Sequence, residues 1–151
     1  NKSTMIALSV AKTVQLSMVG DWYPGANNPE LTAQAAAFEA KYQEPFYLAR
    51  LSVGTELLQK GIEKARSTDP LKIALALENL SYKSVVGDVT MRKDDHQFLS
   101  PQIIYTSHPV DGKRVTKGFD GTDYGFIKES ESSAQSLTLP NECDMKRPNG
   151  V

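Results

Sequence analysis

The stretch from Val86 to Tyr105 constrains the fold most, because a strand pattern is interrupted there by consecutive polar residues. From Val85 to Arg92 apolar and polar side chains alternate, which is the period of a half-buried strand. Residues 93–97 (Lys-Asp-Asp-His-Gln, the polar segment) cannot share an apolar face, and a second strand is expected from Phe98 to Tyr105. The pattern therefore predicts that the chain leaves one packed layer and enters another at the polar segment.

Size and composition favour one domain with a real core. The chain has 151 residues, of which 40% are hydrophobic and 23% charged, as is ordinary for a soluble globular protein. Seventeen basic and eighteen acidic side chains leave a net charge of −1, so no global field attracts nucleic acid or an anionic membrane. The single cysteine, Cys143, excludes an internal disulfide and a multi-cysteine zinc site.

Membrane insertion is not indicated by the sequence. No apolar run approaches the roughly 18–20 residues that a spanning helix requires. The apolar run from Met5 to Val10 is also too short and too polar-flanked for a secretory signal. If the protein is exported, we expect its signal peptide to be absent from this chain.

A strand is expected at Thr13–Val19, followed by the first of three helices. The first helix is capped by Asn28 with Pro29 at its first position, and it is expected to end near Lys41. The second helix is expected from Tyr47 to Arg66. Its predicted apolar face consists of Leu51, Thr55, Leu58, Ile62 and Ala65.

Gly54 lies inside the second helix, where glycine costs about 1 kcal/mol relative to alanine. We therefore expect another backbone to approach closely there. The third helix has the clearest start signal, with Asp69 as N-cap and Pro70 at the first position, and it is expected to stop at about residues 79–81. After these helices and strands, Asp111-Gly112 predicts a hairpin turn between Pro109-Val110 and Arg114-Val115, and Tyr124–Ile127 predicts a short strand.

One group of residues has metal-ligand chemistry. Its members are Asp88, Asp94, Asp95, His96 and His108. Because consecutive residues of a strand point to opposite faces, the three that lie in the polar segment converge only if the backbone turns sharply. A hydrogen-bonded turn is the favoured interpretation, and a metal-dependent enzyme that uses Asp94, Asp95 and His96 stays an alternative.

No catalytic residues and no cofactor are predicted. The sequence lacks a G-x-S-x-G elbow, and Cys143 lies in a polar tail. The glycines at 118, 121 and 125 have neither dinucleotide-binding nor P-loop spacing. From the residues alone, the chain is expected to be an α/β domain that is not an enzyme.

Several segments together resemble the C-terminal portion of type I periplasmic substrate-binding proteins, in the branched-chain amino acid (Leu/Ile/Val) class that feeds ABC importers. The matching segments are Gly20–Pro24, Asn27–Pro29, Phe46–Tyr47, Glu56–Ala65, Ser67–Pro70, Ala76–Glu78, Gly87–Arg92, Asp94–Gln97 and Cys143–Pro148. Residues 87–97 in particular are similar to the family's late G-x-V-x-(F/M)-R-x-x-D-H-Q signature.

This resemblance implies part of a two-lobed α/β fold whose Rossmann-like lobes are joined by crossover strands and close on a ligand. Residues 1–20 and 100–151 would belong to one lobe and residues 25–92 to the other, with crossovers near 21–24 and 93–99. A complete member of the family is more than twice as long as this chain. Most of the parallel sheet of both lobes would then lie outside it.

The resemblance also implies a function without catalysis. The chain would be part of a periplasmic solute-binding component that captures a branched-chain amino acid or a similar small polar ligand and delivers it to a membrane permease. Tyr47 matches an aromatic position that contacts ligand in some members, and Trp22 and Tyr23 could line the cleft. Asp94, Asp95, His96 and Gln97 would brace the hinge. A sensor of the same fold that signals to a regulator stays an alternative.

Overall fold

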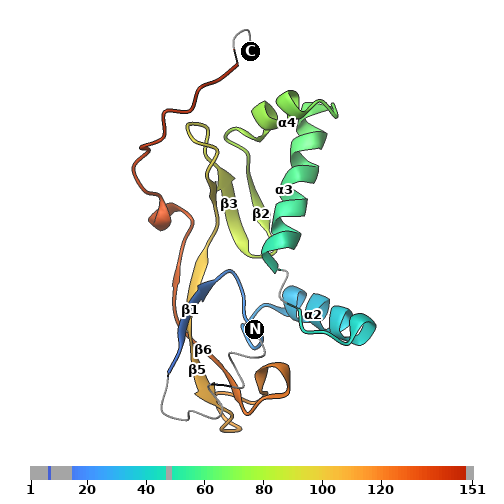
Figure 1. Cartoon of the computed structure of the whole chain (residues 1–151), viewed down its shortest axis with the longest axis vertical. Helices are drawn as coiled ribbons and strands as arrows, with labels where there is room; N and C mark the ends of the chain where they lie inside the picture. The colour runs from blue at the N-terminus through green and yellow to red at the C-terminus, as the bar shows by residue number, and fades with distance from the viewer. Residues whose placement is uncertain (1–6, 8–14, 47–48, 149–151) are drawn as a thin grey trace. The chain divides into compact units, whose positions relative to one another are not determined.

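The computed structural model describes residue 7, residues 15–46 and residues 49–148. The chain divides into two compact units (Figure 1). Unit 1 comprises Asn1–Ala49 and Gln102–Glu131, and unit 2 comprises Arg50–Pro101 and Ser132–Val151. Within the described part of the chain, no helix is both long enough and apolar enough to cross a membrane.

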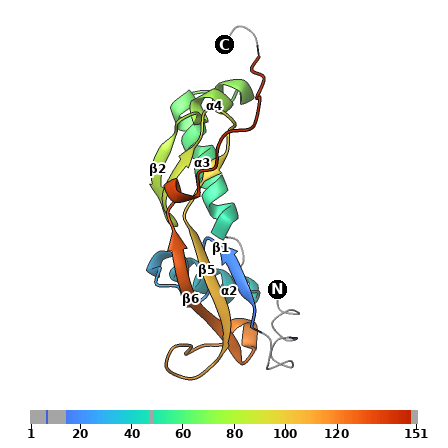
Figure 2. The same ribbon diagram turned by 90° about the vertical axis from the view of Figure 1, so that its left-hand side faces the viewer.

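Unit 1 contains a three-stranded sheet of β1 (Ser17–Gly20), β5 (Gln102–Pro109) and β6 (Tyr124–Ser132). Figure 2 shows β5 between β1 and β6. β1 and β5 are antiparallel, with Ser17 opposite Thr106 and Gly20 opposite Ile103. This pairing joins segments that lie more than 80 residues apart in the sequence.

The core of unit 1 is largely aromatic. Its buried members are Tyr23, Ala26, Phe119, Tyr124 and Phe126. Tyr23 stacks on Tyr105 of β5 with ring centroids 4.9 Å apart, and Phe126 meets both rings edge-on. Such edge-to-face and offset contacts stabilise a core beyond the apolar area that it buries. The short 3-10 turn η1 (Phe119–Gly121) brings Phe119 into this cluster.

The first predicted helix is confirmed as α2 (Pro29–Tyr42), which belongs to unit 1. The Asn28 side chain accepts a hydrogen bond from the Leu31 amide at 3.0 Å, and Pro29 occupies the first turn. These are the two start signals expected from the sequence. Leu31 is fully buried, whereas Tyr42 at the last position is exposed.

Unit 2 contains α3 (Ala49–Ala65), apart from its first residue, together with α4 (Pro70–Leu77) and a second three-stranded sheet. That sheet is formed by β2 (Ser81–Ser84), β3 (Gly87–Met91) and β4 (Phe98–Leu99), with β3 in the centre and antiparallel to both neighbours. α3 runs beside β2 and β3 (Figure 1). The predicted cap of α4 is confirmed, since Asp69 accepts a hydrogen bond from the Lys72 amide at 2.9 Å.

The predicted apolar face of the second helix is wrong. α3 buries Val53, Leu57 and Gly61, whereas Leu51 and Leu58 of the predicted face are exposed. The sequence carries apolar residues on both faces, and the inner side of α3 meets other elements, with Lys60 Nζ 5.1 Å from the Tyr82 ring centroid of β2 and Gly61 beside Leu77 of α4. The close approach predicted at Gly54 is also absent among the described residues, because a Cβ there would meet nothing within 4 Å.

The strands around the polar segment differ from the prediction. β3 begins at Gly87 because a turn at residues 85–86 pairs it with β2, a hairpin that alternation alone did not reveal. Pro101 separates β4 from β5, so residues 98–105 do not form one strand. Val89 and Met91 are buried on the face predicted for them.

The two compact units are a different division of the chain from the expected lobes, and the lobe boundaries stay a prediction. β3 and β4 still pair across the polar segment, with Met91 opposite Phe98, so this segment is a hairpin turn within unit 2. The chain passes into unit 1 at Pro101–Gln102, a few residues beyond the crossover expected near 93–99. α2 lies in unit 1 and residues 132–151 lie in unit 2, so neither unit coincides with an expected lobe.

The second half of the chain also differs in one element. Asp111-Gly112 lies in a loop after β5, and the predicted hairpin partner at Arg114-Val115 is not a strand. The predicted strand at Tyr124–Ile127 is confirmed as the start of β6, which continues to Ser132. A 3-10 turn, η2 (Gln135–Leu137), follows it, and residues 138–148 form no helix or strand.

Candidate ligand-binding site

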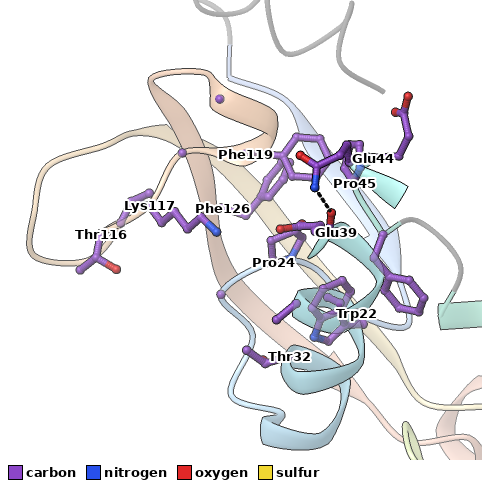
Figure 3. Close-up of a pocket in the computed structure, with 18 of the residues that line it drawn as sticks. Trp22, Pro24, Thr32, Glu39, Glu44, Pro45, Thr116, Lys117, Phe119 and Phe126 are labelled. Atoms are coloured by element: carbon purple, nitrogen blue, oxygen red, sulfur yellow. Dashed lines mark hydrogen bonds between the residues drawn. The ribbon is translucent and has the colours of Figure 1, made fainter. Parts of the chain in front are cut away.

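A hollow of about 620 Å³ lies in unit 1 (Figure 3) and is the candidate site. Three parts of the chain form its wall: the turn after β1, α2 with the segment that follows it, and the loop between β5 and β6. Its aromatic wall residues are Trp22, Phe46, Phe119 and Phe126. An apolar concave wall with a few polar groups is the usual form of a small-molecule site.

Trp22 packs against the aromatic core of unit 1 and against Phe46. Its ring meets Phe46 edge-on at a centroid distance of 5.9 Å, and Phe46 in turn contacts Phe38 of α2. Its Nε1 atom is buried and has no hydrogen-bond partner among the described residues. Because a buried donor without an acceptor is costly, an acceptor for this group is expected elsewhere in the complete site.

The loop that closes one side of the hollow is held by Asp111. Its Oδ1 atom accepts hydrogen bonds from the backbone amides of Val115, Lys113 and Arg114, at 3.0, 2.9 and 2.8 Å. The amides of Val115 and Lys113 contribute most to a lowered pKa of about 2 for Asp111, and the Arg114 side chain assists. The loop therefore has a fixed geometry, in which Val115 is buried against the hollow.

Both acidic and basic side chains line the hollow. Glu39 and Glu44 come from α2 and the segment after it, and Arg114 and Lys117 come from the loop. Figure 3 shows the Lys117 side chain reaching into the hollow from the loop. Such a wall can hold a ligand that has an apolar body together with a carboxylate and an ammonium group.

The structure separates the predicted ligand contacts. Trp22 lines the hollow, whereas the neighbouring Tyr23 is only 6% exposed and belongs to the aromatic core. Burial raises the pKa of the Tyr23 hydroxyl, and the nearby Lys128 offsets part of that shift. Tyr47 lies outside the described residues, so its predicted contact is not placed.

The residues predicted to brace the hinge lie in the turn between β3 and β4. Asp95 accepts from Arg92 through both carboxylate oxygens and from the Gln97 amide. The Arg92 guanidinium, followed by the Gln97 amide, lowers the pKa of Asp95 to about 2. Asp94 and Gln97 are exposed, and His96 has a positive φ of 54°. These bonds fix the turn, and a hinge role for it stays a prediction.

A second cluster, which the sequence did not reveal, joins this turn to the C-terminal tail within unit 2. Arg147 donates to the Glu78 carboxylate and to the Lys93 carbonyl, and His96 Nε2 lies 3.2 Å from Glu78 Oε1. Burial alone would raise the pKa of Glu78, but hydrogen bonds from His96 and Arg147 lower it below its ordinary value. The Arg147 contacts join residues more than 50 positions apart in the sequence, so no local sequence pattern predicts them.

The polar segment does not form a metal site in the described structure. Among the described residues, no group of three or more His, Cys, Asp or Glu side chains is arranged to hold a metal ion.

Four residues that line the hollow were not predicted as site residues: Glu39, Phe46, Lys117 and Phe119. They converge only once α2 and the β5–β6 loop are in place. Their positions in the sequence carry no shared motif.

Comparisons with known proteins give the family. The family model described as a periplasmic binding protein matches residues 2–112. A relative from Brucella abortus, described as Leu/Ile/Val-binding protein homolog 4, is 34% identical over 137 residues, which cover 80% of this chain and 31% of the relative. The same protein from Brucella suis gives the same values. The chain thus spans about a third of the length of the curated relatives that it matches.

Solved structures agree. The Brucella ovis leucine-, isoleucine-, valine-, threonine- and alanine-binding protein, in its closed conformation, matches with a TM-score of 0.76 and 25% identity, covering 95% of this chain and 38% of that one. A branched-chain amino acid ABC transporter protein from Rhodopseudomonas palustris matches with a TM-score of 0.64 at 18% identity, covering 89% and 35% of the two chains, which shows the fold alone. The chain belongs to the periplasmic binding protein family, a family of binding proteins rather than enzymes, and it represents a mixed α/β part of the type I fold.

Proposed function

We propose that this chain is part of the solute-binding component of an ABC importer, which captures a branched-chain amino acid or a similar small polar ligand in the periplasm. The ligand-bound protein would then deliver the ligand to a membrane permease. The observation that carries the proposal is the match to the Brucella ovis amino-acid-binding protein, which extends over 95% of this chain. The 34% identity to a relative described as a Leu/Ile/Val-binding protein homolog supports the same ligand class.

The hollow in unit 1 supplies the chemistry for part of such a site. An aliphatic side chain would lie against the aromatic wall formed by Trp22 and Phe46, where burial of apolar area favours binding. The ammonium and carboxylate of an amino acid match the acidic and basic groups on the two sides of the hollow. We propose Trp22 as a ligand contact on this basis.

The remaining predicted roles are proposals of the same kind. Tyr47 and Tyr23 would contact the ligand through their aromatic rings. Tyr23 is buried, so its ring would contribute less contact area. The turn at Asp94–Gln97, held by the Arg92–Asp95 pair, would brace the region from which the chain passes out of unit 2. No general acid, base or nucleophile is required, because capture depends on complementary surfaces and a closing motion.

A thermal-shift screen tests the proposal. The protein is a chimera in which this chain replaces the matched stretch of the Brucella abortus relative, so that the complete length is present. The probes are L-leucine, L-isoleucine, L-valine, L-threonine and L-alanine, with L-aspartate and L-lysine as controls of wrong side-chain charge. A ligand that binds only the folded protein raises its melting temperature. Stabilisation by at least one aliphatic amino acid supports the proposal, and a folded chimera that responds to none of the five contradicts it.

A further inference from the structure

The C-terminal segment 138–148 is attached to the rest of unit 2 with little burial of its own side chains. Every residue of this segment is exposed except Met145, which is half-buried, and Leu139 is 68% exposed. Burial of apolar surface therefore contributes little to its attachment. We call residues 138–148 the strap.

Polar contacts at two points attach the strap to the region of the turn between β3 and β4. Near its start, the Leu139 carbonyl accepts a hydrogen bond from Arg92. Near its end, Arg147 donates to the Lys93 carbonyl at 2.6 Å and, through its other terminal nitrogen, to the Glu78 carboxylate. Two of the three acceptors are backbone carbonyls, which do not titrate. Glu78 is therefore the acceptor at which pH can act on the strap.

The Glu78 carboxylate receives two different parts of the chain on one oxygen atom. His96 Nε2, from the turn, lies 3.2 Å from Glu78 Oε1, and Arg147, from the strap, donates to the same oxygen. The Glu78 side chain is 11% exposed, so these partners largely replace water around it. Hydrogen bonds from a guanidinium to an ionised carboxylate are stronger than those between neutral groups. The strap end is thus held chiefly by the charge of one shielded carboxylate.

The charged groups around this carboxylate favour its ionised form. Besides His96 and Arg147, Lys64 of α3 donates to the Glu78 carbonyl at 3.3 Å. On the turn, Asp95 is paired with Arg92, and so its charge is already offset. Burial alone would raise the pKa of Glu78, but hydrogen bonds from His96 and Arg147 lower it, and the carboxylate takes up a proton only below its ordinary value of 4.5.

We propose that the strap is an acid-released tether, in which protonation of Glu78 detaches the Arg147 end from the turn between β3 and β4. In acid the His96 imidazole also carries a proton, so two cations then face an uncharged carboxyl group and their repulsion favours separation. The Leu139 contact does not titrate and remains, so that residues 140–148 extend into solvent from that point. The proposal does not depend on which ligand unit 1 binds.

Paramagnetic broadening in NMR spectra tests the proposal in the 151-residue chain. A nitroxide is attached to Cys143, the single cysteine, which is exposed and lies four residues from both Leu139 and Arg147. At about 3.5 Å per residue, the label is attached within about 14 Å of the docked end of the strap. It should therefore broaden the amide signals of Lys93 and Asp94 while the strap is docked. Circular dichroism of the same samples reports whether the helices stay folded.

The unchanged protein should show this broadening at about pH 7 and lose at least about three-fold of it by about pH 3, with the helical signal retained. Glu78→Gln does not titrate at this position, so its broadening should be weak at neutral pH and independent of pH. Glu63→Gln is the matched control, because Glu63 is an exposed acid of α3 that bonds to Gln59 and not to the strap. This control should follow the unchanged protein at every pH.

His96→Asn gives a second and independent variant. Asparagine tolerates the positive φ of 54° at this position, so the turn is retained while one donor to Glu78 is removed. Protonation of Glu78 then becomes easier, and release should move to higher pH. An unchanged release pH in this variant would contradict Glu78 as the titrating group.

Three other outcomes would overturn the proposal. The first is broadening that does not change with pH in the unchanged protein. The second is the same pH dependence in Glu78→Gln as in the unchanged protein. The third is a loss of broadening that occurs only together with loss of the helical signal, because acid would then unfold unit 2 instead of releasing the strap.

Discussion

At the scale of single residues, Trp22 carries the proposed contact with ligand. Replacement by alanine removes an aromatic wall of the hollow and should weaken binding of the best amino acid in the chimera by about 1–3 kcal/mol. Calorimetric titration measures the change. Tyr42→Ala is the matched control, because Tyr42 is an exposed aromatic residue of the same unit that does not line the hollow. Equal losses in both variants, or none in Trp22→Ala, would remove Trp22 from the site.

Asp111 gives a prediction on pH. Its pKa of about 2 lies below the ordinary value of 3.8, because the folded loop donates three backbone hydrogen bonds to the carboxylate. A lowered folded-state pKa means that the carboxylate stabilises the fold above a pH of about 4, and that this contribution is lost as the pH falls toward 2.

Carbon-detected NMR titration of the Asp111 carboxyl should give this low pKa. The unchanged protein should lose stability between pH 4 and pH 2, a window set by the two pKa values, and Asp111→Asn should lack this loss because asparagine does not titrate. Lys113→Ala keeps the backbone amide and should retain the titration. A pKa of Asp111 near 3.8 in the folded protein would show that the amides do not hold the carboxylate.

The residues that line the hollow were only partly named from the sequence, for a physical reason. The resemblance named both Trp22 and Tyr23 as cleft residues; Trp22 lines the hollow, whereas Tyr23 is buried in the aromatic core, and contact of either with a ligand stays a prediction. Glu39 and Lys117 were missed, since each is an ordinary surface residue until the fold brings α2 and the β5–β6 loop together. A local sequence pattern indicates the chemistry of a residue, but it does not show which distant residues come together in the folded protein.

At the scale of elements, the two glycines of α3 should respond in opposite directions to the same substitution. Gly61→Ala introduces a Cβ 2.7 Å from Leu77 Cδ2 and should destabilise the chain by about 1–3 kcal/mol through overpacking. Gly54→Ala meets no neighbour within 4 Å and should stabilise the helix by up to about 1 kcal/mol. Urea unfolding of both variants measures the two effects. A Gly61→Ala variant that is as stable as the unchanged protein would show that α3 does not pack closely at Gly61.

The tail gives a second prediction at this scale. Arg147 links the segment 138–148 to Glu78 and to the carbonyl of Lys93, and Leu139 accepts a hydrogen bond from Arg92. Arg147→Ala should release the tail and increase its cleavage by trypsin at Lys146 several-fold, because cleavage follows local opening. Lys128→Ala, which removes an exposed ion pair with Glu131, is the control and should leave cleavage at Lys146 unchanged. An unchanged cleavage rate in Arg147→Ala would contradict a tethered tail.

Helix starts were predictable, and helix faces were not. Asn28-Pro29 and Asp69-Pro70 begin α2 and α4 where expected, because capping depends only on neighbouring residues. The predicted face of α3 was wrong, since apolar residues lie on both sides of this helix and the folded structure buries Val53 and Leu57 instead.

At the scale of the whole molecule, the family and the α/β class followed from motifs that extend over much of the chain, above all Gly87–Gln97. The pairing of the strands was not predicted: β3 and β4 pair across the polar segment, and β1 pairs with β5 over a long separation in sequence. The pairing of distant strands depends on tertiary structure, which no local motif records.

The central proposal is that this chain forms part of an amino-acid-binding protein. Isothermal titration of the chimera with L-leucine tests it most directly, with the intact Brucella abortus relative as reference and its remainder without this chain as the negative control. We predict one ligand bound per chimera and a negative heat-capacity change, as burial of apolar surface requires, with no binding to the remainder alone. A folded chimera that gives no heat with L-leucine while the intact relative binds it, or a remainder that binds equally well by itself, would contradict the claim.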